Sequence, residues 1–160
     1  MTQRTHPSGN QKGRPGRRTS PPTLWALRDP EMLGLVFQAF EALTTLRPYC
    51  ARQVAEAREE DRLFGHLWLT PDHWGLQRWS GMSERITTSW QVLDRTVRTN
   101  QLDLAQCQEC YRHMLGIRTT WAGLDRQASS LKLLDKTTDC LRQVLIRYAQ
   151  AQGQLRRPQP

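Results

Sequence analysis

The chain has 160 residues, 38% of them hydrophobic, and a net charge of +8, which is enough for one domain with an ordinary core. Its four cysteines are too few and too irregularly spaced for a small disulfide-linked secreted domain. No apolar run approaches the roughly 20 residues that span a bilayer, and the apolar core of a signal peptide is missing. We therefore expect an intracellular protein with reduced thiols and no membrane span.

Residues 1–23 are basic, with five Lys or Arg residues, no acidic residue and almost nothing apolar. Such a segment cannot bury enough surface to offset its ordering entropy, so we expect a disordered basic N-terminal arm. Its KGRP sequence, which begins at Lys12, resembles the core of an AT-hook, a motif that lies in the minor groove of A·T-rich DNA. The resemblance implies nucleic-acid contacts by four basic residues, Lys12, Arg14, Arg17 and Arg18. The alternative is a nuclear-import signal or a nonspecific polyanion contact. Ser20 lies in an RRTSP context that suits phosphorylation by kinases.

Residues 24–66 are expected to form two amphipathic helices. Asp29 is placed as the N-cap of the first helix and Pro30 at its first helical position, which satisfies free amide groups and suits the helix dipole. Apolar residues then recur at steps of three and four. Pro48 is expected to end or kink this helix, and the second helix would continue to Phe64.

Residues 67–82 are expected to form a connector that contains three tryptophans among Gly, Pro and Asp: Trp68, Trp74 and Trp79. Tryptophans in such a corner either close the end of a helical bundle or serve as exposed anchors for a partner. Burial of the rings distinguishes the two interpretations.

Residues 83–152 are expected to form one long heptad helix or a helical hairpin. Steps of four and three select an a/d seam that is apolar or aromatic at all but one position: Ile86, Trp90, Leu93, Val97, Asn100, Leu104, Cys107, Tyr111 and Met114. An asparagine in such a seam fixes register and partner number, so Asn100→Leu would raise the melting temperature. After Met114 the phase slips twice, which indicates overwinding or a break near Gly116, Gly123 or Ser129–Ser130. Residues 153–160 are expected to be a disordered tail.

The spacing of Cys107, Cys110 and His113 looks like half of a zinc site. On a helix, however, these residues climb about 9 Å along the axis, and no second Cys/His pair of suitable spacing completes four ligands. A structural role in a helix is therefore favoured over a metal site or a Cys/His nucleophilic pair. The chain also has no phosphate loop, dinucleotide fingerprint, HExxH motif or nucleophile elbow, so we expect no enzyme, metal or cofactor.

These patterns together predict an all-α protein, an elongated helical bundle or coiled coil with a disordered basic arm. The expected function is a non-enzymatic coiled-coil subunit or adaptor of a larger intracellular assembly, in the nucleus or cytoplasm. It would bind protein partners, as a homo- or hetero-oligomer, through the a/d seam, and would have no small-molecule substrate. The alternative is a DNA- or chromatin-associated factor that dimerises through the long helix and contacts nucleic acid through the arm.

Overall fold

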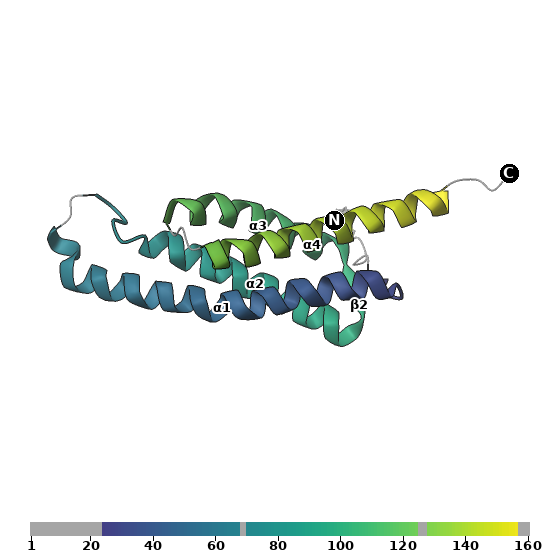
Figure 1. Ribbon diagram of the computed structural model, residues 1–160, viewed down its shortest axis with the longest axis horizontal. Coiled ribbons are helices and arrows are strands. Elements are labelled where there is room, and N and C mark those ends of the chain that lie inside the picture. The colour runs from purple at the N-terminus through teal and green to yellow at the C-terminus, as the bar shows by residue number, and fades with distance from the viewer. Residues whose placement is uncertain (1–23, 68–69, 125–127, 157–160) are drawn as a thin grey trace, which may run out of the picture.

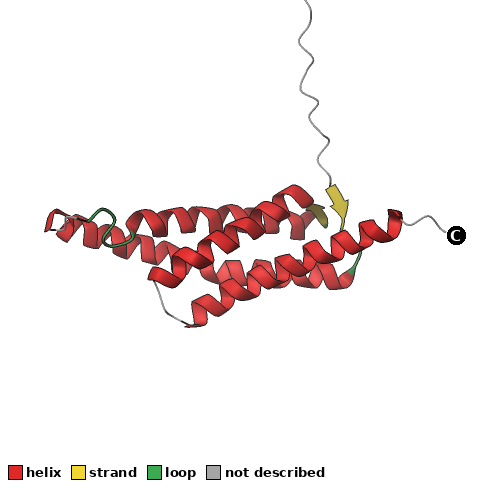
Figure 2. Ribbon diagram, turned by 90° about the horizontal axis from the view of Figure 1, so that it is seen from above, coloured by secondary structure: helices red, strands yellow, loops and turns green. Residues whose placement is uncertain are grey.

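The structure, a computed structural model, describes residues 24–67, 70–124 and 128–156. In chain order its elements are β1 (Leu24–Ala26), α1 (Pro30–Phe64), η1 (Gly65–Leu67, a 3-10 helix), α2 (Leu76–Thr99), β2 (Gln101–Asp103), α3 (Leu104–Leu124) and α4 (Ala128–Arg156). Consecutive helices run in opposite directions, and Figure 1 and Figure 2 both show them side by side in an elongated bundle. The expected all-α bundle is confirmed. None of the helices described is long and apolar enough to cross a membrane.

The core lies between the four helices, because α1 and α3 each pack against both α2 and α4. The largest side chains with almost no exposed surface come from every helix: Trp121, Met32, Leu43, Leu46, Ile86, Leu93, Met114, Ile117, Leu134 and Leu141. Burial of each such side chain contributes about 1.5–3 kcal/mol, so the helices depend on one another for stability.

The start of α1 is confirmed, and its expected end is wrong. The amide of Glu31 donates to Oδ1 of Asp29 at 2.9 Å, with Pro30 in the first turn. Pro48 lies inside α1, which continues to Phe64 as a single helix. Leu46 and Cys50 beside the proline are buried, and this packing against other helices offsets the lost helical hydrogen bond.

Two short strands tie the beginning of the described chain to the bundle. β1 pairs with β2 in antiparallel register, with Trp25 opposite Leu102, and the amide of Leu27 donates to the carbonyl of Asn100 at 2.8 Å. The Trp25 ring packs edge-on against Tyr148 of α4, with ring centroids 4.9 Å apart. Residues 24–66 therefore form a strand, one α-helix and the start of η1, instead of the two amphipathic helices expected.

The tryptophan connector is shorter than expected, because α2 begins at Leu76. Trp79 is 4% exposed and belongs to the core, which confirms the bundle-closing interpretation for this residue. Trp74 is half-buried with its ring 6.3 Å from that of Phe64, and Trp68 lies outside the described residues.

Of the two alternatives for residues 83–152, one uninterrupted helix is wrong. A break between α3, which ends at Leu124, and α4, which begins at Ala128, lies where the hairpin alternative placed one, near Gly123 and Ser129–Ser130. α2 ends at Thr99, and Asn100 is an exposed residue in the left-handed conformation, with φ 52° and ψ 30°. Asparagine is one of the few residues that adopt this conformation readily, and here it allows the chain to turn into β2. Residues 83–152 are thus divided among three helices, a coiled coil is not confirmed, and α4 continues through Gly153 into the expected tail as far as Arg156.

The substitution Asn100→Leu distinguishes a left-handed cap from a seam position. At a positive φ, leucine should lower the free energy of unfolding by about 1–2 kcal/mol, whereas a buried seam position would give a higher melting temperature. Asn100→Gly is the matched control, since glycine adopts this conformation without steric cost. Urea unfolding followed by circular dichroism measures both, and a leucine variant more stable than the glycine variant would contradict the cap.

Candidate functional site

The a/d seam does not form one exposed surface. Its most buried members lie in the protein's own core, each with no exposed surface: Ile86 and Leu93 on α2, and Cys107 and Met114 on α3. Four other members are half-buried along the same two helices: Trp90, Val97, Leu104 and Tyr111. The heptad period therefore describes how this chain packs on itself, and partner contacts remain open only to the half-buried members and to the exposed Asn100.

The cysteines that resemble half of a zinc site are enclosed. No group of three or more His, Cys, Asp or Glu residues in the described part of the chain could hold a metal ion. Burial raises the pKa of Cys107 to about 12 and the pKa of Cys110 to about 11. At neutral pH both are thiols rather than thiolates, and the thiolate is the form that attacks carbon or binds zinc.

His113 takes part in a small polar network between α2 and α3. Ser89 Oγ and His113 Nδ1 form a hydrogen bond of 3.4 Å, and His113 Nε2 lies 3.3 Å from Oε1 of Glu109. A hydroxyl, an imidazole and a carboxylate in sequence are the groups of a hydrolase triad. However, Ser89 has no exposed surface, so its hydroxyl is buried between α2 and α3 and is not open to a substrate in this structure. The network satisfies buried polar groups at the helix interface.

An aromatic and arginine cluster lies on the surface where α1 meets α2. Its centre is the half-buried Trp90, whose Nε1 donates to Oγ1 of Thr44 at 2.9 Å and whose ring stacks on Phe40 at 5.7 Å. The guanidinium of Arg47 lies over the same ring, 4.2 Å from its centroid. Phe37, 47% exposed, continues the aromatic row. Trp, Arg and Phe are residue types that are enriched at protein interfaces, and here they lie together with part of their surface exposed.

Two hollows follow one another beside this cluster, and we call them together the α1/α2 groove. The first, of about 330 Å³, is lined by Thr44, Arg47, Pro48, Ala51 and Trp90. The second, of about 390 Å³, is lined by Val54, Arg58, Ser80, Ser83, Glu84, Thr87, Thr88 and Gln91. Pro48 has no N–H group for the carbonyl of Thr44, so a backbone acceptor without its helical donor lies in the groove wall. Small side chains from both helices leave the groove open.

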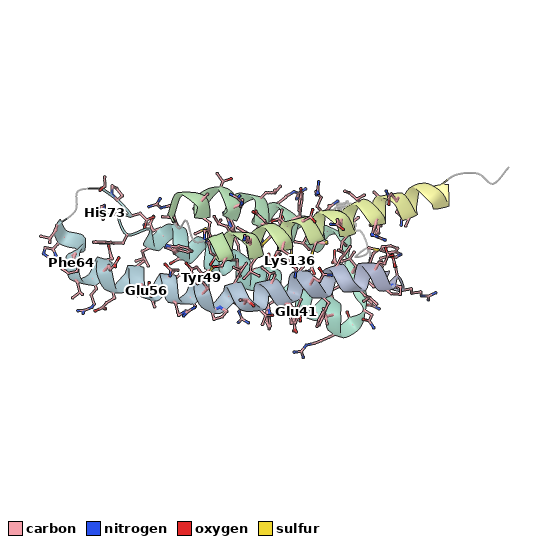
Figure 3. All side chains as sticks on the ribbon, in the orientation of Figure 1. Glu41, Tyr49, Glu56, Phe64, His73 and Lys136 are labelled. Atoms are coloured by element: carbon pink, nitrogen blue, oxygen red, sulfur yellow. The ribbon has the colours of Figure 1, made fainter. Side chains whose placement is uncertain are left out.

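The far end of α1 carries a second apolar feature. Figure 1 shows α1 running past the ends of α3 and α4. Three apolar side chains near this end are 44–64% exposed: Leu63, Phe64 and Leu67. Figure 3 labels Phe64 here, with His73 from the connector above it.

A more polar hollow, of about 590 Å³, lies between α1 and the start of α4. Its lining is Thr45, Leu46, Tyr49, Arg52, Gln53, Glu56, Ser129, Ser130 and Leu133. Figure 3 labels Tyr49 and Glu56 on the α1 side of this hollow. Because Arg52 and Glu56 both line it, the hollow has no net charge that would select an anion or a cation.

The α1/α2 groove was missed by the sequence patterns, except for Trp90 in the seam. The groove's α1 residues recur at steps of three and four on the side of the helix away from the core. Because they do not form an apolar stripe, the apolar periodicity that predicts a core-facing side does not reveal them. The arm residues Lys12, Arg14, Arg17, Arg18 and Ser20 lie outside the described residues, so DNA contact and phosphorylation stay predictions from the sequence.

Comparison of the chain with protein-family models finds no match, and comparisons with curated proteins and with solved structures find none either. The functional argument therefore depends on the residues of this chain alone.

Proposed function

We propose that this protein is a non-enzymatic helical-bundle adaptor of a larger assembly and that it binds a partner protein through the α1/α2 groove. The observation that carries this proposal is the half-exposed cluster of Arg47 and Phe40 around Trp90. Trp and Arg are enriched among the few residues that supply most of the binding energy of protein interfaces, especially beside a pocket that a partner side chain fills. The proposal moves partner binding from the a/d seam, whose central residues are buried, to this neighbouring surface.

Three features support a binding role over catalysis. The Ser89 hydroxyl, beside the half-buried His113, has no exposed surface, and the raised pKa values of Cys107 and Cys110 disfavour nucleophilic thiolates. Glu84 and several hydroxyl side chains line the α1/α2 groove, but in the described part of the chain no hydrogen bond joins the Glu84 carboxylate to any of these hydroxyls, as activation of a nucleophile by a base requires. It instead offers apolar rings, small side chains and arginine, which suit recognition of another protein.

The test is site-specific photo-crosslinking in cells, with a photoreactive amino acid at Ala51 in the groove or at the exposed Gln108 on α3. We expect a discrete protein adduct from position 51, lost in the Arg47→Glu and Trp90→Ala variants and retained in Arg112→Glu, a matched charge reversal on α3. Circular dichroism confirms folding, and Arg47→Glu keeps the test valid if Trp90→Ala is unstable. Equal adducts from both positions, or none from position 51, would refute the groove as the binding site.

A further inference from the structure

We infer that the α1/α2 groove receives an amphipathic α-helix of another protein, with apolar anchors along its centre and carboxylates along the edge that faces α1. This inference rests on the proposed function and specifies the chemistry of the partner. Its grounds are the shape of the groove, the state of the backbone in its walls and the placement of unpaired charges on its rims.

The groove has the length of a short helix. From Thr44 to Arg58 it follows α1 for about four turns, or roughly 21 Å, which matches a helix of about 14 residues. Its two hollows would take anchors on one face of that helix, as in grooves that bind residues at i, i+3, i+4 and i+7. Ala51 and Ser83 in the lining allow close approach of a helix backbone.

The walls of the groove favour a helix over an extended peptide. Both walls are helices, whose N–H and C=O groups are already paired along their own axes. A strand that binds by main-chain hydrogen bonds needs an open sheet edge, and the groove has none. The carbonyl of Thr44, opposite Pro48, is the exception and offers one acceptor only. The partner must therefore satisfy its own backbone, which a helix does.

The α1 rim presents two arginines without ion pairs. The described arginines that hold ion pairs are Arg62, Arg78, Arg98, Arg112, Arg118, Arg142 and Arg147. Arg47 and Arg58 are not among them, and they lie about three turns, or roughly 16 Å, apart on the groove. Four other described arginines hold no ion pair, but they lie outside the two hollows: Arg28, Arg52, Arg85 and Arg95.

The orientation of Arg47 leaves its donors available. Its guanidinium carbon lies over the Trp90 ring, 4.2 Å from the centroid, and no ion pair in the described part of the chain holds its N–H groups, so they can receive a carboxylate. Stacking on a ring also restricts the side chain, which lowers the entropy lost when a carboxylate binds. Two carboxylates about three turns apart on one edge of a helix would meet Arg47 and Arg58 together.

The opposite rim gives the groove a direction. Glu84 of α2 is exposed, lines the second hollow and forms no ion pair in the described part of the chain. A basic residue on the edge of the partner helix that faces α2, at the end of the groove near Arg58, would complement Glu84. A helix bound in reverse would place that basic residue near Arg47, and repulsion would disfavour it. Glu84 also disfavours a phosphate backbone in this groove.

The experiment selects helices from a phage-displayed library, in which one helix of about 14 residues has randomised edge positions and fixed leucines at the anchor positions. Three forms of the full chain serve as bait: the wild type, the groove variant Arg47→Glu/Arg58→Glu, and a matched control, Arg112→Glu/Arg142→Glu, which reverses two charges outside the groove. We expect Asp and Glu to be enriched at least tenfold over Lys and Arg on one edge by the wild type and by the matched control. The groove variant should show the reverse preference.

Other outcomes would overturn the inference. The selected helices could show no preference for acidic residues while crosslinking at Ala51 still depends on Trp90. That result would refute the carboxylate edge of the partner and leave the proposed function unaffected. If no helix is enriched, the occupant is not an amphipathic helix. A second copy of this chain is another possible occupant, because its α1 carries three acidic residues in a row, Glu59, Glu60 and Asp61. Sedimentation of the purified chain tests whether it self-associates. A dimer that Arg47→Glu dissociates would show the groove filled by self-association.

Discussion

Replacing Trp121 with alanine is expected to lower the free energy of unfolding by about 3–5 kcal/mol, the range for truncation of a fully buried aromatic side chain. Trp121 of α3 has no exposed surface. Its ring stacks on Tyr49 of α1 at 5.6 Å and meets Trp79 of α2 edge-on at 5.1 Å. It therefore joins three helices, and its loss leaves a cavity that none of them can fill alone. Urea unfolding followed by circular dichroism measures the change.

Two further variants test the cause of this loss. Leu115→Ala, on the same helix but 46% exposed, should change stability by no more than about 0.5 kcal/mol. Trp121→Phe should cost less than Trp121→Ala, because the ring is retained and the indole N–H has no hydrogen-bond partner in the described structure. If Trp121→Ala is as mild as Leu115→Ala, Trp121 does not hold the three helices together.

The start of α1 was predictable because its signal is local. The Asp29 side chain and the ring of Pro30 act within one turn, and both are visible in the sequence. The fate of Pro48 was not predictable in the same way. A proline inside a helix costs about 3 kcal/mol, and what offsets this cost is burial of Leu46 and Cys50 against residues far along the chain.

The seam was predicted correctly in period and wrongly in continuity. Ile86, Leu93, Cys107 and Met114 are all buried, as an a/d pattern requires. Asn100 fits the same spacing, yet it is exposed at the end of α2. An asparagine in a seam and an asparagine in a left-handed cap look the same in a heptad count, so the spacing alone could not separate them.

The α1/α2 groove could not be predicted, since it depends on the register of two helices. Arg47 and Ala51 gain a role only because Trp90 of α2 packs beside Thr44, and no pattern within α1 specifies that neighbour. The pairing of β1 with β2 was equally hidden, because three-residue strands carry no usable alternation. Local signals thus located the helix start, and contacts between distant segments built the site.

Deleting residues 1–27 is expected to lower the free energy of unfolding by about 3 kcal/mol or more, whereas deleting residues 1–23 should leave it unchanged. The difference comes from a short segment in which Leu27 is 5% exposed and Trp25 packs on Tyr148, since burying such side chains contributes about 1.5–3 kcal/mol each. The longer deletion also removes β1 and its pairing with β2. Thermal and urea unfolding of the two truncated chains measures the effect.

The shorter deletion also separates the two functions that the sequence left open. If the arm is an independent electrostatic module, the chain without residues 1–23 should lose any affinity for a DNA duplex, together with the fall of that affinity with salt. It should keep the crosslinks from Ala51, because the α1/α2 groove is built only from residues 44–91. A Leu27→Ala point variant in the full chain controls for instability. Loss of stability on removing 1–23 alone would instead mean that the arm packs against the bundle, and the boundary at residue 24 would be wrong.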